Sequence, residues 1–94
     1  MNKDYSYMTN EQFINITIKE LSTIENGLLS PYNLTSQNNM FIDDFNRIRK
    51  DISNRNINVS IPEYVNYDDT KDSIINKSKF LRRELDNIVI KGTY

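Results

Sequence analysis

The segment NINVSIPEYVNYDD, Asn56 to Asp69, separates two stretches of helical periodicity and decides the fold class. Its apolar residues Ile57, Val59 and Ile61 alternate, which is typical of a short β-strand. A strand needs an edge to pair with, and the chain contains no second convincing strand pattern. We therefore expect an all-α protein in which this segment is an extended apolar connector.

The first helix is expected over residues 10–26. Thr9 and Gln12 have the spacing of a capping box, which satisfies two free N–H groups at a helix start. Asn26 and Gly27 indicate the end of the helix, and Pro31 follows. The apolar residues fall on one arc of the helix: Phe13, Ile14, Ile18, Leu21, Ile24 and Leu28.

The second helix is expected over residues 38–54, after a loop that we expect Leu29, Tyr32 and Leu34 to fix to the core. Its acidic residues lie early and its basic residues late, which suits the helix dipole. Asp43 and Arg47 have the spacing of an ion pair on one helix face. A single buried seam is predicted from four apolar residues: Phe41, Phe45, Ile48 and Ile52.

The third helix is expected over residues 70–91, with Asp68, Asp69 or Thr70 as its N-cap and Gly92 as its end. Together the segments predict one domain, residues 1–94, folded as a small antiparallel three-helix bundle. The residues predicted to share the buried face of the third helix are Ile74, Leu81, Leu85, Ile88 and Val89.

The connector itself has two local interpretations, a strand-like run and a short helical turn that begins at Pro62 and extends through Tyr67. Its position also has two interpretations. It covers the core of a bundle that is short of apolar surface, or it presents Tyr64 and Tyr67 to a partner. The sequence favours the cover and leaves both open.

The composition limits the chemistry of the chain. It contains neither His nor Cys, which excludes Ser-His and Cys-His nucleophiles and zinc sites built from these residues. Gly27 and Gly92 are the only glycines, so the chain has no glycine-rich phosphate-binding loop. We expect no enzymatic activity, no cofactor and no metal.

The bulk properties indicate where the protein acts. The net charge is −1 and the mean hydropathy is −0.67, and no apolar run is long enough to span a membrane. The first residues lack the apolar region of a signal peptide, so we expect a cytoplasmic protein without a membrane partner. Fourteen Asn, thirteen Ile and no Ala indicate an AT-rich genome, such as that of a phage, a virus or another mobile element.

Three functions remain. The first is a small protein-binding module, an inhibitor or adaptor, because aromatic and apolar residues lie outside the helical seams; self-association through the third helix is included. The second is a DNA-binding regulator, because residues 46–94 carry ten basic and seven acidic side chains. The third is a structural subunit of a larger assembly. The candidate protein contacts are Ile61, Tyr64, Val65, Tyr67, Phe80 and Ile90, and the candidate nucleic-acid contacts are Arg47, Arg49, Lys50, Arg55, Lys79, Arg82 and Arg83.

Overall fold

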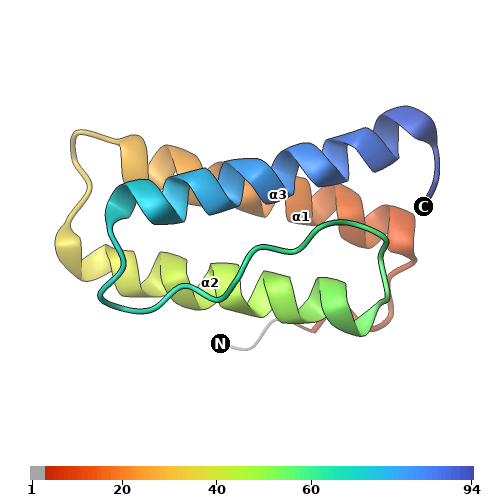
Figure 1. Ribbon diagram of the computed structural model, residues 1–94, viewed down its shortest axis with the longest axis horizontal. Coiled ribbons are helices and arrows are strands. Elements are labelled where there is room, and N and C mark those ends of the chain that lie inside the picture. The colour runs from red at the N-terminus through yellow and green to blue at the C-terminus, as the bar shows by residue number, and fades with distance from the viewer. Residues whose placement is uncertain (1–3) are drawn as a thin grey trace.

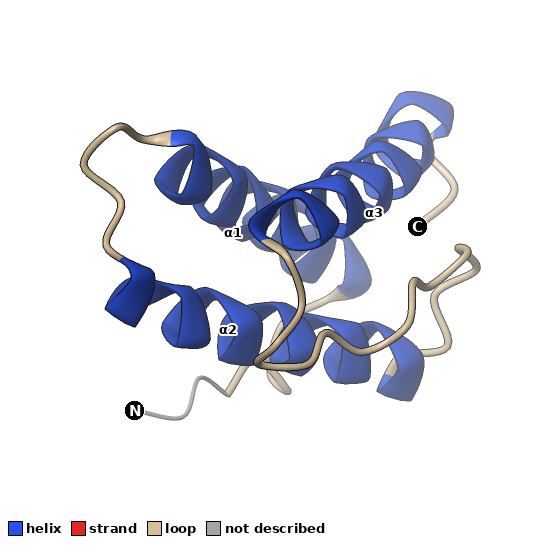
Figure 2. Cartoon of the chain, turned by 60° about the vertical axis from the view of Figure 1, so that its left-hand side comes forward, coloured by secondary structure: helices blue, strands red, loops and turns tan. Residues whose placement is uncertain are grey.

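Three helices, α1 (Asn10–Leu29), α2 (Thr35–Asn54) and α3 (Lys71–Lys91), form the scaffold of the computed structural model, which describes residues 4–94 (Figure 1). Figure 2 shows that the described residues contain helices and loops without a β-strand. The expected all-α three-helix bundle is therefore confirmed. α1 packs most extensively against α3.

The connector sets the direction of α3. Pro62, Val65 and Tyr67 meet α2 at Arg49, Asn46 and Asp43 respectively, so the connector runs back along α2 in the opposite direction. As a result α3 starts at the same end of the molecule as α2 and runs parallel to it, whereas α1 is antiparallel to both (Figure 1). The expected antiparallel arrangement of the helices therefore does not hold for α2 and α3. A tight turn between α2 and α3 would have reversed α3, so the long connector is what produces this arrangement.

α1 begins as the capping box predicts. The Gln12 N–H donates to Thr9 Oγ1 at 3.2 Å, and the Thr9 N–H donates to Gln12 Oε1 at 3.0 Å. The expected end at residue 26 is wrong, because α1 continues through Gly27 to Leu29. Leu28 is buried at 1% exposure, and this packing holds the last turn in place.

α2 begins at Thr35, three residues earlier than expected. The Gln37 side chain accepts a hydrogen bond from the Leu34 N–H at 3.2 Å, which satisfies a free donor at the helix start. The predicted seam is also shifted at one position, since Ile42 is buried and Phe41 only partly so. The ring of Phe41 lies against Gly27 of α1, where the missing side chain leaves room for it.

α3 has the ends that its sequence predicts. The Ser73 N–H donates to Thr70 Oγ1 at 3.1 Å, and Gly92 ends the helix in the left-handed conformation with φ +64°. Glycine adopts this conformation without the steric cost that a side chain adds. The residues of the core come from all three helices and the connector: Phe13, Ile14, Leu21, Ile24, Leu28, Ile42, Phe45, Ile48, Ile52, Val65, Ile74, Ile75, Leu81, Leu85 and Ile88.

Candidate protein-binding surface

The connector lies between α2 and α3 as extended chain, and neither local interpretation of it is correct. It forms no strand, and the only turn near its end covers residues 67–69 instead of starting at Pro62. The Asp69 N–H donates to the Asn66 carbonyl at 3.0 Å, and the Asn66 N–H donates to Asp69 Oδ2 at 3.1 Å. These bonds redirect the chain into α3.

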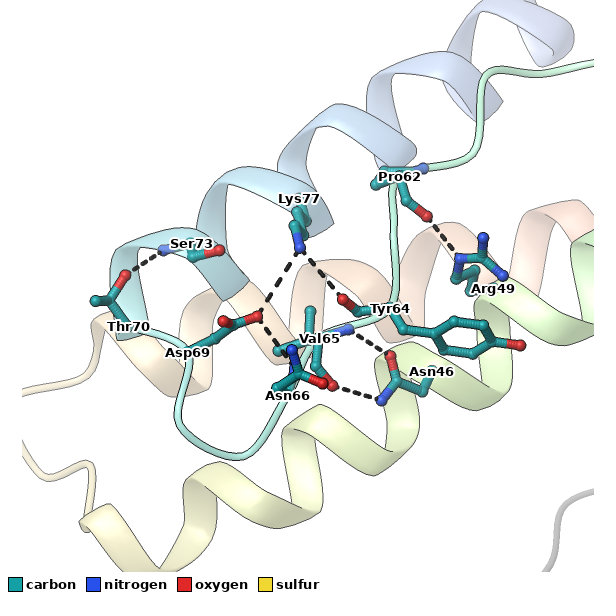
Figure 3. Close-up of polar contacts among 10 residues, drawn as sticks. All are labelled: Asn46, Arg49, Pro62, Tyr64, Val65, Asn66, Asp69, Thr70, Ser73 and Lys77. Carbon is teal, nitrogen blue, oxygen red and sulfur yellow. Dashed lines mark hydrogen bonds and ion pairs between the residues drawn. The ribbon is translucent and has the colours of Figure 1, made fainter.

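Asn46 of α2 holds the connector at its centre (Figure 3). Its Nδ2 donates to the Val65 carbonyl and its Oδ1 accepts from the Val65 N–H, both at 2.9 Å. The side-chain amide thus takes the place of a neighbouring strand for one residue. With its backbone satisfied, Val65 inserts its side chain into the core at 3% exposure.

Tyr64 is fixed by Arg49 of α2. The Arg49 Nε donates to the Pro62 carbonyl at 2.7 Å, and its guanidinium carbon lies 4.0 Å from the centre of the Tyr64 ring (Figure 3). This distance is within the range of a cation–π interaction. The Tyr64 side chain nevertheless remains 51% exposed, so its ring is held in place and is still accessible.

Tyr67 is fixed by Asp43 of α2. Its hydroxyl donates to Asp43 Oδ1 at 2.5 Å, while its side chain is 64% exposed. The hydrogen bond to the carboxylate, together with its negative charge, raises the pKa of Tyr67 above the ordinary value for tyrosine. Asp43 therefore does not serve the ion pair expected with Arg47, which bonds to Glu20 and Asp51.

Polar contacts from α3 also hold the connector. The Lys77 ammonium donates to the Tyr64 carbonyl at 3.4 Å and lies 3.9 Å from Asp69 Oδ2 (Figure 3). Further along, the Ser60 N–H donates to Glu84 Oε1 at 3.0 Å. Both helices thus hold the segment, which leaves it little freedom to move as a loop.

Of the six candidate protein contacts, two are buried or partly buried and four are exposed. Val65 is a core residue and cannot contact a partner while the protein is folded, and Ile61 is only partly exposed. Tyr64 and Tyr67 are exposed on the connector. The connector therefore covers the core and also presents aromatic side chains. The remaining two candidates are exposed on α3: Phe80 at 46% and Ile90 at 80%.

Three of the candidate nucleic-acid contacts form ion pairs within the protein. Arg47 pairs with Glu20 of α1, and Arg82 of α3 lies 3.3 Å from Glu25 of α1. Lys79 lies 3.9 Å from the same Glu25 carboxylate. These basic groups tie α2 and α3 to α1 and are already partly neutralised.

Two more candidate basic residues hold backbone segments. Arg49 bonds the connector, and Arg55 donates to the Met8 and Tyr5 carbonyls at the start of the chain. Lys50 and Arg83 are exposed on different helices. Five of the seven candidate basic residues are therefore engaged in contacts within the protein.

A third exposed apolar group was missed by the sequence analysis. Leu29, Tyr32 and Leu34 are 61%, 87% and 60% exposed, so the expectation that they fix the loop to the core is wrong. Ser30 closes this loop on itself, because its Oγ accepts from the Tyr32 N–H and its carbonyl accepts from the Asn33 N–H, both at 3.1 Å. The loop is thereby held by local bonds and projects away from the core.

A cleft of about 360 Å³ lies between the N-terminal segment and the end of α2. Residues 4–94 contain no cluster of acidic residues arranged to hold a metal ion. Within the same residues, no helix has the length and apolar character needed to cross a membrane. The cleft is lined by Asp4, Tyr5, Ser6, Phe13, Asp51, Asn54 and Arg55.

Comparison with known protein families, curated proteins and solved structures finds no match to this chain.

Proposed function

We propose that the protein is a small non-enzymatic protein-binding module, and that Tyr64 and Tyr67 of the connector are its main contacts. The observation that supports this most directly is that both rings are more than half exposed while each is fixed by a polar contact from α2. Exposed side chains are normally mobile, and ordering them costs free energy when a partner binds. Here that ordering has already occurred in the folded protein.

The chemistry of these residues suits a protein partner. Tyrosine and arginine are enriched at protein interfaces, because each combines a large contact area with hydrogen-bonding groups. Tyr64 presents a ring face already stacked on Arg49, and Tyr67 presents a ring whose hydroxyl is anchored to Asp43. A partner surface with an apolar pocket and hydrogen-bonding groups at its rim would accept both. Occupation of that pocket would make the protein an inhibitor or an adaptor.

The test compares two pairs of tyrosines. The variant Tyr64→Ser/Tyr67→Ser removes the proposed contacts, and Tyr7→Ser/Tyr32→Ser removes two more exposed tyrosines, 78% and 87% exposed, as a matched control. Affinity capture from the cell that encodes the protein identifies the partners that the unmodified protein and the control both retain. Calorimetry with a purified partner should then show at least about tenfold weaker binding for the connector variant, since loss of an aromatic anchor typically costs 1–2 kcal/mol or more.

Thermal unfolding separates binding from stability. A connector variant that keeps its fold and loses its partner supports the proposal. Equal affinity of the connector variant and the control for every captured partner would overturn the proposal. So would the capture of no partner at all. A large loss of stability in the connector variant would show that the tyrosines serve mainly as cover.

A further inference from the structure

α3 has two faces that differ sharply in their role. One packs into the bundle, and its buried residues are Ile74, Ile75, Ser78, Leu81, Leu85 and Ile88. The opposite face points away from the bundle. It carries Phe80 and Ile90, which are 46% and 80% exposed, among polar side chains. This outer row consists of five exposed residues: Asn76, Phe80, Arg83, Asn87 and Ile90.

The outer row has the spacing of a coiled coil. Its members are separated by steps of four, three, four and three residues, which is the alternation of a and d positions in a heptad repeat. Phe80 and Asn87 occupy a positions, and the other three residues occupy d positions. Because the core uses residues at other heptad positions, α3 keeps its place in the bundle while this row remains free for a second helix.

The charges beside this row identify the second helix. In a parallel two-stranded coiled coil, each g residue lies near the e residue five positions later on the partner helix. On α3 every such pair between two identical helices has opposite charges: Asp72 with Lys77, Lys79 with Glu84, and Asp86 with Lys91. An antiparallel pair with Phe80 against Ile90 would instead bring Lys77 near Lys91 and each Glu84 near its own copy.

We propose that α3 binds α3 of a second copy of this chain as a parallel coiled coil. Arg83 fits this arrangement, because at a d position it lies beside Glu84 of the second copy, which offsets the repulsion between the two Arg83 side chains. Among the described residues, the Arg83 side chain forms no ion pair or hydrogen bond. Asn87 at an a position favours two strands in register.

Several of these flanking residues already make contacts within the chain. Among the e residues, Lys77 lies 3.9 Å from Asp69 with its side chain 26% exposed, and Glu84 accepts from the Ser60 N–H, so each would have to share its charge with the second copy. Lys79 lies 3.9 Å from Glu25 and Asp86 lies 3.4 Å from Arg82, but the Lys79 and Asp86 side chains remain 39% and 38% exposed. Each can share its charge with the second copy. Only Phe80 and Ile90 add large apolar groups to the seam, so we expect a dissociation constant on the order of 10–1,000 μM.

Sedimentation equilibrium over a range of protein concentrations tests the association. The unmodified protein should pass from monomer to dimer, and Phe80→Glu and Ile90→Glu should each shift the midpoint at least about tenfold upward by placing a charge in the seam. Met40→Glu is the matched control, since Met40 is an exposed apolar residue on α2 at 56% exposure. A protein that stays monomeric at millimolar concentration overturns the proposal, as does a dimer that persists in both α3 variants.

Disulfide cross-linking tests the direction of the helices, because the chain contains no natural Cys. In a parallel pair the two copies of residue 76 face each other, so Asn76→Cys should cross-link at least about tenfold faster than the exposed control Asn39→Cys on α2, through its higher effective concentration. In an antiparallel pair residue 76 lies far from its own copy. Equal rates for the two cysteines, in a protein that dimerises, would overturn the parallel arrangement.

Discussion

Asn46 of α2 and Val65 of the connector are joined by two hydrogen bonds, each 2.9 Å long, so that one side-chain amide satisfies both backbone groups of one residue. This relationship explains how an extended segment without a neighbouring strand can lie over the core. The Val65 side chain could not be buried unless the adjoining N–H and C=O groups found partners, because unpaired polar groups at such a site are costly.

Replacing Asn46 should therefore destabilise the protein. Asn46→Ala leaves both Val65 backbone groups without their partner, and we expect a loss of about 2–3 kcal/mol in the free energy of unfolding. Asn46→Asp retains the acceptor, loses the donor and places a carboxylate against the Val65 carbonyl, so it should cost at least as much near neutral pH. Urea denaturation measures both, with Asn39→Ala on the exposed side of α2 as the control. A loss below about 0.5 kcal/mol for Asn46→Ala would show that the amide is not needed.

Gly27 and Phe41 make a second testable pair. Alanine inside a helix is usually more stable than glycine by about 1 kcal/mol. Here a Cβ at residue 27 would overlap the Phe41 ring, with the two ring carbons Cε1 and Cε2 at 3.1 Å. We expect Gly27→Ala to be destabilising in the natural sequence. In a Phe41→Leu background the same change should become neutral or stabilising, and a double-mutant cycle from denaturation measurements gives the coupling. Additive effects would rule out the steric explanation.

Thr17 and Ser78 have fully buried hydroxyl groups without a hydrogen-bond partner. A buried hydroxyl loses its bonds to water and here gains nothing in return. Thr17→Val and Ser78→Ala remove that cost with little change of shape, so each should raise the free energy of unfolding, by up to about 1 kcal/mol. Thr23→Val is the contrasting control, because the exposed Thr23 hydroxyl donates to the Lys19 carbonyl at 3.0 Å. Destabilisation by both core variants would indicate that these hydroxyls have a role.

The bond between Tyr67 and Asp43 predicts a dependence on alkaline pH. The pKa of Tyr67 is raised in the folded protein. The bond therefore contributes its full stability below the pKa of a tyrosine in the unfolded chain, about 10. That contribution is lost as the pH rises through the higher pKa of the folded state. Tyr67→Phe lacks it, and its thermal stability should therefore fall less steeply above pH 10 than that of the natural protein.

The ultraviolet absorbance of tyrosinate provides a direct check of this assignment. The titration of the natural protein should contain one tyrosine with a pKa above the ordinary value, and Asp43→Asn should lower that pKa by removing the charge. Tyr32→Phe is a suitable control, since Tyr32 is exposed and remote from Asp43 in sequence. If the titration of the Asp43→Asn variant matched that of the natural protein, the bond would not exist in solution.

The helix ends were predictable where the signal is local. The Thr9–Gln12 capping box, the Thr70 cap and the Gly92 end depend on hydrogen bonds and backbone conformations within a few neighbouring residues. The end of α1 was not predictable, because the turn beyond Asn26 is held by burial of Leu28 in the core, which local sequence does not specify. The buried seam of α2 likewise contains Ile42 in place of Phe41, whose ring lies against Gly27 of α1.

The candidate protein contacts were also predictable only in part from the sequence. The sequence singled out Tyr64, Tyr67 and Phe80 as aromatic residues outside the helical seams, and the structure exposes all three. It also grouped Val65 with them, although Val65 is buried. Adjacent residues of an extended segment point to opposite sides, and only the position of α2 decides which side is the core.

The sequence alone determined that the chain forms three helices with an apolar connector, because helical periodicity, caps and stops are properties of neighbouring residues. Only the tertiary structure decided the direction of α3 and the position of the connector. Asn46, Arg49 and Asp43 hold the connector along the length of α2, although they lie 13 to 24 residues from their partners. Contacts at that separation depend on how the connector and the helices pack, and a pattern of adjacent residues does not specify them.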